Sequence, residues 1–120
     1  MYSIKYYVTS RGECPFRTFL DGAQPKVKAK FINVLDLLAF SGPNLKRPYA
    51  DLLRDDIREL RVRLGRNRYR ALYFFIMGEH IIITHGILKN EDKVPPAEIN
   101  RALRYKKDFE ERLGRGEVSL

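Results

Sequence analysis

Residues 57–88 read IRELRVRLGRNRYRALYFFIMGEHIIITHGIL, and this stretch decides the fold. Its first part, 57–64, alternates apolar and charged side chains, the pattern of a strand with one buried face. The segment 68–77 is nearly all apolar after its first three residues, as in a central strand covered on both faces. A third strand, 80–87, is rich in isoleucine. Two short glycine-containing turns separate these strands, which predicts an antiparallel meander.

Helical patterns flank the meander. Residues 2–8 are aromatic and β-branched and predict one more strand. Prolines open two helices with apolar residues at helical spacing, 15–20 and 25–39, and the segment 45–56 is expected to be a loop. A last helix spans 95–114. The order β-α-α-β-β-β-α predicts a small α+β fold, in which a small antiparallel sheet carries two N-terminal helices and a C-terminal helix.

The composition indicates a folded domain with an anionic partner. The 120 residues are about one domain long and 44% of them are hydrophobic, so we expect residues 1–120 to form a single domain. The chain has 23 Lys and Arg against 15 Asp and Glu, a net charge of +8 and a pI near 9.8. Such a surplus favours a polyanion, either nucleic acid or an acidic membrane, although positive charge can also serve solubility alone.

The sequence also bears on the compartment. Cys14 is the only cysteine, so an internal disulfide cannot form and a reducing environment is expected. The N-terminus lacks the apolar run of a secretory signal, and the longest apolar stretch, 71–77, is too short to cross a bilayer. We therefore expect a cytoplasmic protein that does not bind membranes.

Arginines concentrate where the first two strands of the meander meet. Between Arg58 and Arg70 there are six arginines and one glutamate. Each guanidinium offers a planar fork of donors that matches phosphate oxygens. The alternative is a solvated face that protects a sheet edge, but lysine is the usual residue there and this cluster lies beside the best-buried strand. Pairing of the two strands brings four arginines into one predicted phosphate-binding patch: Arg61, Arg63, Arg68 and Arg70.

Three further side chains are candidates for the same site. His85 shares its alternation with Ile81 and Ile83, which favours a hydrogen-bonded core residue, whereas a catalytic role needs it beside the arginines. Lys89 and Lys93 lie in the loop before the last helix. Lysines in loops are usually solvated, and a functional role for these two would be to hold phosphates or stabilise charge.

Several kinds of site are missing from the sequence. It contains no HExxH motif, no Cys/His cluster and no regularly spaced acidic set, so we expect neither a metal site nor a cofactor. The absence of a glycine-rich phosphate loop argues against an NTPase. The basic residues lie on predicted strands, which argues against a helix-turn-helix DNA reader.

Four short sequence motifs, taken together and in their order along the chain, indicate a protein family. They are ELR at 59–61, YRALYF at 69–74, THGILK at 84–89 and PPAEI at 95–99. Together they resemble the RelE/HigB toxin superfamily, and most closely the phage-derived, HigB-like branch of type II toxin–antitoxin systems. The resemblance spans about residues 15–110 and implies the same small α+β fold.

The resemblance also implies a function. It implies a toxin that inhibits translation as a metal-independent endoribonuclease, cleaving messenger RNA in the ribosomal A site, and a cognate antitoxin, expected to be a helix-turn-helix protein. It places Arg61 and Arg70 in the active site, and His85 matches a further motif position. In this chemistry the RNA 2′-OH attacks its own 3′ phosphate, and the arginines stabilise the extra charge of the transition state. Tyr69 would stack on a base, or belong to the core.

Three alternatives remain open at the level of sequence. A non-catalytic RNA- or ribosome-binding module would use the same arginines without cleavage. A protein that binds only protein partners would present them to an acidic surface. A degenerate toxin would keep the fold without activity, and the pair Lys89-Asn90, where the family pattern has adjacent basic residues, is where such a loss would show. Arg70→Ala is expected to abolish toxicity and to leave thermal stability largely intact.

Overall fold

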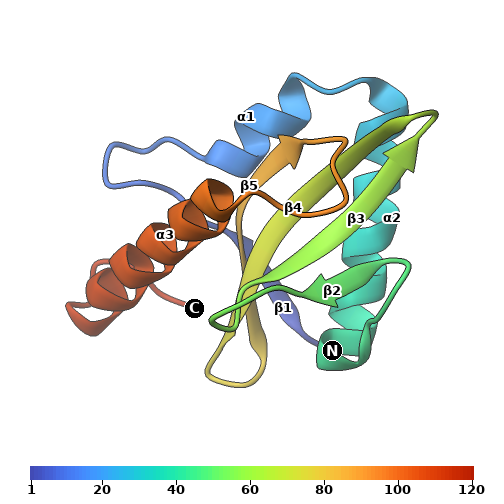
Figure 1. The fold of residues 1–120 in the computed structure, drawn as a ribbon. Helices are drawn as coiled ribbons and strands as arrows, with labels where there is room; N and C mark the ends of the chain where they lie inside the picture. Colours follow the sequence, from blue (N-terminus) through green and yellow to red (C-terminus); the bar gives the residue numbers. More distant parts are fainter.

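The computed structural model describes residues 1–120 and confirms the α+β class, with two N-terminal helices and one C-terminal helix (Figure 1). None of the helices combines the length and the apolar character needed to cross a membrane. The elements along the chain are β1 (Ser3–Tyr6), α1 (Pro15–Asp21), α2 (Pro25–Ser41), the short 3₁₀ helix η1 (Gly42–Asn44), β2 (Ala50–Leu52), β3 (Arg58–Leu64), β4 (Asn67–Ile76), β5 (His80–Leu88) and α3 (Pro96–Gly114).

The five strands form one sheet in the order β1-β5-β4-β3-β2. The meander β3-β4-β5 is antiparallel, as its short turns predict. Two features differ from the expectation. β1 pairs with β5 in parallel, so the sheet is mixed, and β2 forms within the segment expected to be a loop. β2 is only three residues long and pairs along the edge of β3, which is too short a stretch for alternation to reveal.

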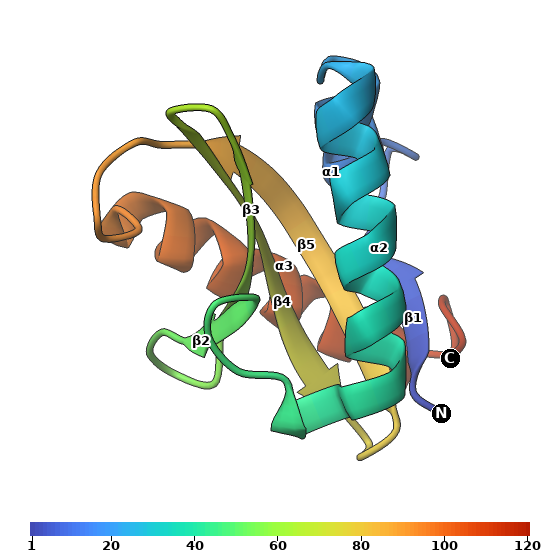
Figure 2. The same ribbon diagram turned by 90° about the vertical axis from the view of Figure 1, so that its right-hand side faces the viewer.

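Helices cover both faces of the sheet. α1 and α2 lie on one face and α3 lies on the other (Figures 1 and 2). Alternation along β4 divides its side chains between the two layers. Ala71 and Tyr73 belong to the core under α1 and α2, whereas Leu72 and Phe74 belong to the core under α3. β4 is therefore buried on both faces, as its apolar sequence predicts.

A β-bulge interrupts β5 and changes which face its last residues occupy. Leu72 pairs with His85 but Tyr73 pairs with Ile83, so Thr84 is an extra residue in the strand. An extra residue reverses the alternation of all residues beyond it. Ile83 belongs to the core under α1 and α2, whereas His85 faces α3 and contacts its first turn. The prediction that His85 shares the face of the preceding isoleucines is therefore wrong.

Candidate functional site

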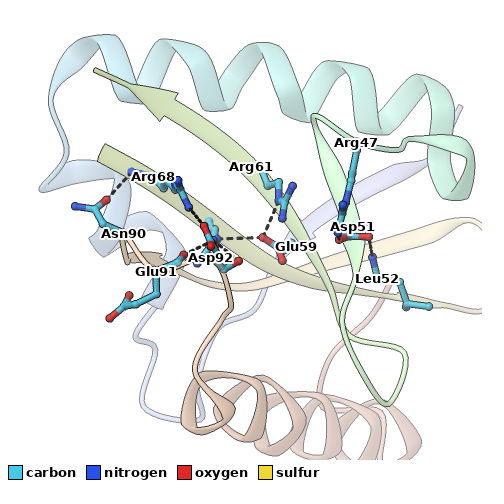
Figure 3. Close-up of polar contacts among 10 residues, drawn as sticks. Arg47, Asp51, Leu52, Glu59, Arg61, Arg68, Asn90, Glu91 and Asp92 are labelled. Carbon is cyan, nitrogen blue, oxygen red and sulfur yellow. Dashed lines mark hydrogen bonds and ion pairs between the residues drawn. The ribbon is translucent and has the colours of Figure 1, made fainter. Parts of the chain in front are cut away.

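Four arginines lie side by side on the α3 face of the sheet, at one end of the β3–β4 hairpin. Strand register places Arg61 directly opposite Arg70 and Arg63 directly opposite Arg68. They border a groove of about 540 Å³. Figure 3 shows Arg61 and Arg68 of this set, with Arg68 beside Asp92 of the loop that precedes α3. Strand pairing therefore brings the four arginines together through the two-residue period of the strands, and their binding of phosphate stays a prediction. The groove is lined by Arg47, Pro48, Arg61, Val62, Arg63, Arg68, Tyr69, Arg70 and Asp92.

Glu59 makes this concentration of charge possible. Like charges directly opposite each other on neighbouring strands repel, so the pair Arg61–Arg70 needs a counter-charge. Glu59 Oε1 accepts hydrogen bonds from Arg61 Nε at 3.2 Å and lies 3.1 Å from Arg70 Nε. Its side chain is 3% exposed. Sequence reasoning passed over Glu59, although a single acid on the same strand face as Arg61 was the available signal.

Arg70 forms the buried floor of the groove. Its side chain is 3% exposed. While Nε faces Glu59, Nη2 donates to the backbone carbonyls of Glu91 at 2.7 Å and Asp92 at 3.1 Å. Nη1 is buried and has no partner. A buried donor without an acceptor is costly, so Nη1 would gain from an acceptor placed beside it.

The loop between β5 and α3 is tied to the edge of this groove. The Asn90 side chain accepts a hydrogen bond from the backbone N–H of Arg68 at 2.9 Å. Arg68 Nη1 donates to Asp92 Oδ1 at 2.6 Å, and the guanidinium lowers the pKa of the Asp92 carboxyl below its ordinary value of 3.8 (Figure 3). Arg68 and Arg70 thus hold the loop from two sides, which positions Asp92 as part of the groove lining.

The remaining lining residues make the groove strongly cationic. Arg63 is exposed and forms no ion pair, so its guanidinium is free to bind a ligand. Arg47 reaches the groove from the segment before β2 and pairs with Asp51 at 2.7 Å (Figure 3). Sequence reasoning missed Arg47 because only tertiary structure brings that segment to β3. Five arginines and one carboxylate, that of Asp92, line the groove. No three His, Cys, Asp or Glu side chains come close enough together to hold a metal ion.

His85 does not line this groove. Its ring is 1% exposed, with Nε2 3.3 Å from Glu98 Oε1 and Nδ1 2.9 Å from Thr84 Oγ1. Burial, helped by the positive charges of Arg101 and Arg104, lowers the pKa of His85 from 6.5 to about 3. Because a carboxylate only accepts hydrogen bonds, we assign the proton of the neutral ring to Nε2. A neutral, covered imidazole that joins β5 to α3 fits a core histidine better than a proton carrier.

The other predicted residues surround the groove to different degrees. Tyr69 is 6% exposed and belongs to the core under α1 and α2, with its ring 6.4 Å from that of Phe19, although it also contributes to the groove lining. Lys89 continues the strand ladder through its N–H bond to the carbonyl of Arg68. Lys93 is exposed in the loop. Neither lysine is part of the groove lining.

Comparison with known proteins places this site in a family. A family model described as Phage derived protein Gp49-like (DUF891) matches residues 18–107, which are 90 of the 120 residues and include β3, β4 and β5. A search of curated proteins found no match. The matched segment contains every arginine of the groove. The chain therefore belongs to the phage-derived Gp49-like family, a toxin-like family related to RelE and HigB.

Proposed function

We propose that this protein is the toxin of a toxin–antitoxin pair and that it cleaves messenger RNA on the ribosome without a metal ion. The observation that carries the proposal is the buried, unpartnered Nη1 of Arg70 at a groove lined by five arginines. Guanidinium groups arranged in this way bind phosphate oxygens through paired, charge-assisted hydrogen bonds. Membership of a toxin-like family supports the same proposal.

The reaction that suits the groove uses the RNA itself as the nucleophile. The 2′ oxygen attacks the adjacent phosphorus, the bond from phosphorus to the 5′ oxygen breaks, and the products carry a 2′,3′-cyclic phosphate and a 5′-OH. The proton of the 2′-OH is lost as the leaving 5′ oxygen gains one. Arg61 and Arg70 would stabilise the additional negative charge on the phosphorane, an effect for which one donor is commonly worth on the order of a hundredfold in rate.

The proposed roles of the other residues differ. Arg63 and Arg68 would bind flanking phosphates, and Lys89 and Lys93 would contact RNA from the loop before α3. His85 is left out of the chemistry because its ring is 1% exposed and lies outside the groove lining, and because a pKa lowered to about 3 makes it a weak base. Tyr69 is left out because its ring is part of the core. The antitoxin would cover a cationic groove, so we propose that it presents acidic side chains there.

A second function is favoured by one observation. No histidine or lysine lines the groove, and Asp92, its single carboxylate, has a lowered pKa. Neither arginine nor such a carboxylate is suited to accept and return a proton near neutral pH. The same groove in a non-catalytic module would bind RNA or the ribosome and block translation without cleavage.

Induced expression in bacteria with mapping of messenger RNA 5′ ends separates these functions. The variant to use is Arg61→Ala, because Arg70 still pairs with Glu59 after this change and the fold should be retained. Arg66→Ala is the matched control, since Arg66 is exposed in the hairpin turn and lies outside the groove lining. New 5′ ends within translated regions, present in the control and lost in Arg61→Ala, support the endoribonuclease. Growth arrest without new ends supports the binding module, and no effect on growth contradicts the toxin function.

A further inference from the structure

The carboxylate of Asp92 occupies the place in the groove where an anionic ligand would be expected. Asp92 Oδ1 accepts a short, charge-assisted hydrogen bond from Arg68 Nη1 at 2.6 Å. The Asp92 side chain is 92% exposed, whereas that of Arg68 is 34% exposed. The donor face of Arg68 is thus occupied by a group that projects from the loop into solvent.

Asp92 is chemically out of place among its neighbours. It is the single carboxylate in a lining that contains five arginines. The buried carboxylate of Glu59 is the counter-charge of Arg61 and Arg70, and it makes no ion pair with Arg68. A carboxylate and a phosphate both present oxygen acceptors to a guanidinium, so Asp92 uses the donor that a phosphate would use.

The backbone of the loop is held independently of the Asp92 side chain. Arg70 Nη2 binds the carbonyls of Glu91 and Asp92, and the Asn90 side chain binds the N–H of Arg68. Rotation about the side-chain bonds of Asp92 therefore releases Arg68 while the loop keeps its tethers. Ion pairs as exposed as this one contribute little to the free energy of folding, so replacement of Asp92 by another anion at Arg68 costs little stability.

We propose that Arg68 is a phosphate subsite of the groove and that Asp92 is its resident competitor, displaced when an RNA phosphate binds. This inference rests on the proposed function in that it takes RNA as the ligand, but it concerns binding and not cleavage. A ligand that binds several arginines at once displaces Asp92 from Arg68. A small monoanion binds only one guanidinium, and its binding free energy is too small to displace the carboxylate. Asp92 thereby biases the groove toward polyanions.

Binding of a short, single-stranded 2′-O-methyl RNA tests the proposal, because this RNA lacks the 2′-OH needed for cleavage. Asp92→Asn keeps the shape of the side chain and removes its charge. Glu91→Gln is the matched control, since it makes the same change of charge one residue away at a side chain that pairs with nothing. By fluorescence anisotropy, Asp92→Asn is expected to bind about threefold to tenfold more tightly than the wild type, and Glu91→Gln within about twofold.

A double-mutant cycle separates competition for Arg68 from a general effect of charge. In an Arg68→Ala background, Asp92→Asn should increase the affinity for RNA much less than it does in the wild type, because no Arg68 guanidinium remains to be released. Equal affinities of Asp92→Asn and Glu91→Gln overturn the proposal. The proposal is also overturned if Asp92→Asn increases the affinity for RNA as much in the Arg68→Ala background as in the wild type.

A second measurement distinguishes this proposal from the proposed function. Titration with inorganic pyrophosphate is followed through the NMR signal of the Arg68 Nε–H group. A shift of this signal that occurs at lower pyrophosphate concentration in Asp92→Asn supports the subsite even if the protein cleaves no RNA. An Arg68 signal that pyrophosphate leaves unmoved in both proteins overturns the subsite, whatever the outcome of the cleavage experiment.

Discussion

Arg70 Nε lies 3.1 Å from Glu59 Oε1, and each of the two side chains is 3% exposed. This burial changes what Arg70→Ala tests. Removal of one partner from a buried ion pair leaves an uncompensated charge and commonly costs 3–5 kcal/mol. Arg61, which also contacts Glu59, compensates in part. Arg70 is therefore a structural residue in addition to its proposed role in binding phosphate.

Arg70→Ala is expected to lower the free energy of unfolding by about 3 kcal/mol. The change removes the buried ion-pair partner of Glu59 and the hydrogen bonds from Arg70 to the loop carbonyls. The expectation from sequence, that stability stays intact, is revised accordingly. Urea denaturation measures the change. Arg63→Ala, at an exposed arginine without an ion pair, should stay within about 0.5 kcal/mol of the wild type. A wild-type denaturation midpoint for Arg70→Ala contradicts the prediction.

The fold could be predicted wherever local pattern and turn length act together. Alternation in β3 and the short turn to β4 lead directly to the register of Arg61 and Arg70. The parallel pairing of β1 could not be predicted, because no short turn links β1 to its neighbour β5. The bulge at Thr84 carries no local signal, since a threonine is ordinary in a strand, yet it moves His85 to the other face of the sheet.

The site could be predicted as a set of residue types but not as a network. The arginines are visible in sequence because they are close together along the chain. The contacts that hold these arginines in place are not visible in the sequence. Arg68 is hydrogen-bonded to a residue 24 positions away, and Arg47 lies in a segment that has no regular pattern. The burial of Glu59, which allows the arginines to lie side by side, depends on these distant contacts as well.

The salt dependence of RNA binding should depend on Arg63. Each phosphate neutralised on a single strand contributes about 0.7 to the slope of log affinity against log salt concentration. Arg63→Ala is expected to reduce the magnitude of that slope by about this amount, because an exposed guanidinium at the groove is lost. Arg66→Ala should keep the wild-type slope. Binding titrations at several salt concentrations measure both, and equal slopes for the two variants contradict the placement of RNA in the groove.

Gly86 should be intolerant of a side chain. A Cβ atom at this position would lie 2.3 Å from Cδ2 of Phe19, whose ring is held against Phe16 and Phe31. Gly86→Ala is expected to lower the free energy of unfolding by about 1–3 kcal/mol, the range for overpacked cores. Gly114→Ala is the control, because a Cβ there meets nothing within 4 Å. Equal denaturation midpoints for the two variants would show that Phe19 is free to move.

Stability should fall as the pH is lowered toward 5, because of His85. Burial and the facing Arg101 and Arg104 lower the pKa of His85 to about 3, although Glu98 lies nearby. The unfolded chain takes up the proton near pH 6.5 and the folded protein does not, so protonation favours the unfolded state below pH 6.5. The free energy of unfolding should therefore decrease with a slope that approaches about 1.4 kcal/mol per pH unit below pH 6, or by about 1.6 kcal/mol in all between pH 6.5 and pH 5.

The variant His85→Gln identifies the source of this loss. Glutamine retains a donor for Glu98 but does not titrate, so the free energy of unfolding of the variant should be nearly flat between pH 6.5 and pH 5. His80→Gln leaves His85 in place and should retain the wild-type slope. Carboxyl groups titrate mainly below this window in the unfolded chain, which keeps the comparison specific to histidine. A His85→Gln slope equal to that of the wild type would mean that His85 reaches solvent and takes up its proton in the folded protein, which would return it to the set of candidate proton carriers.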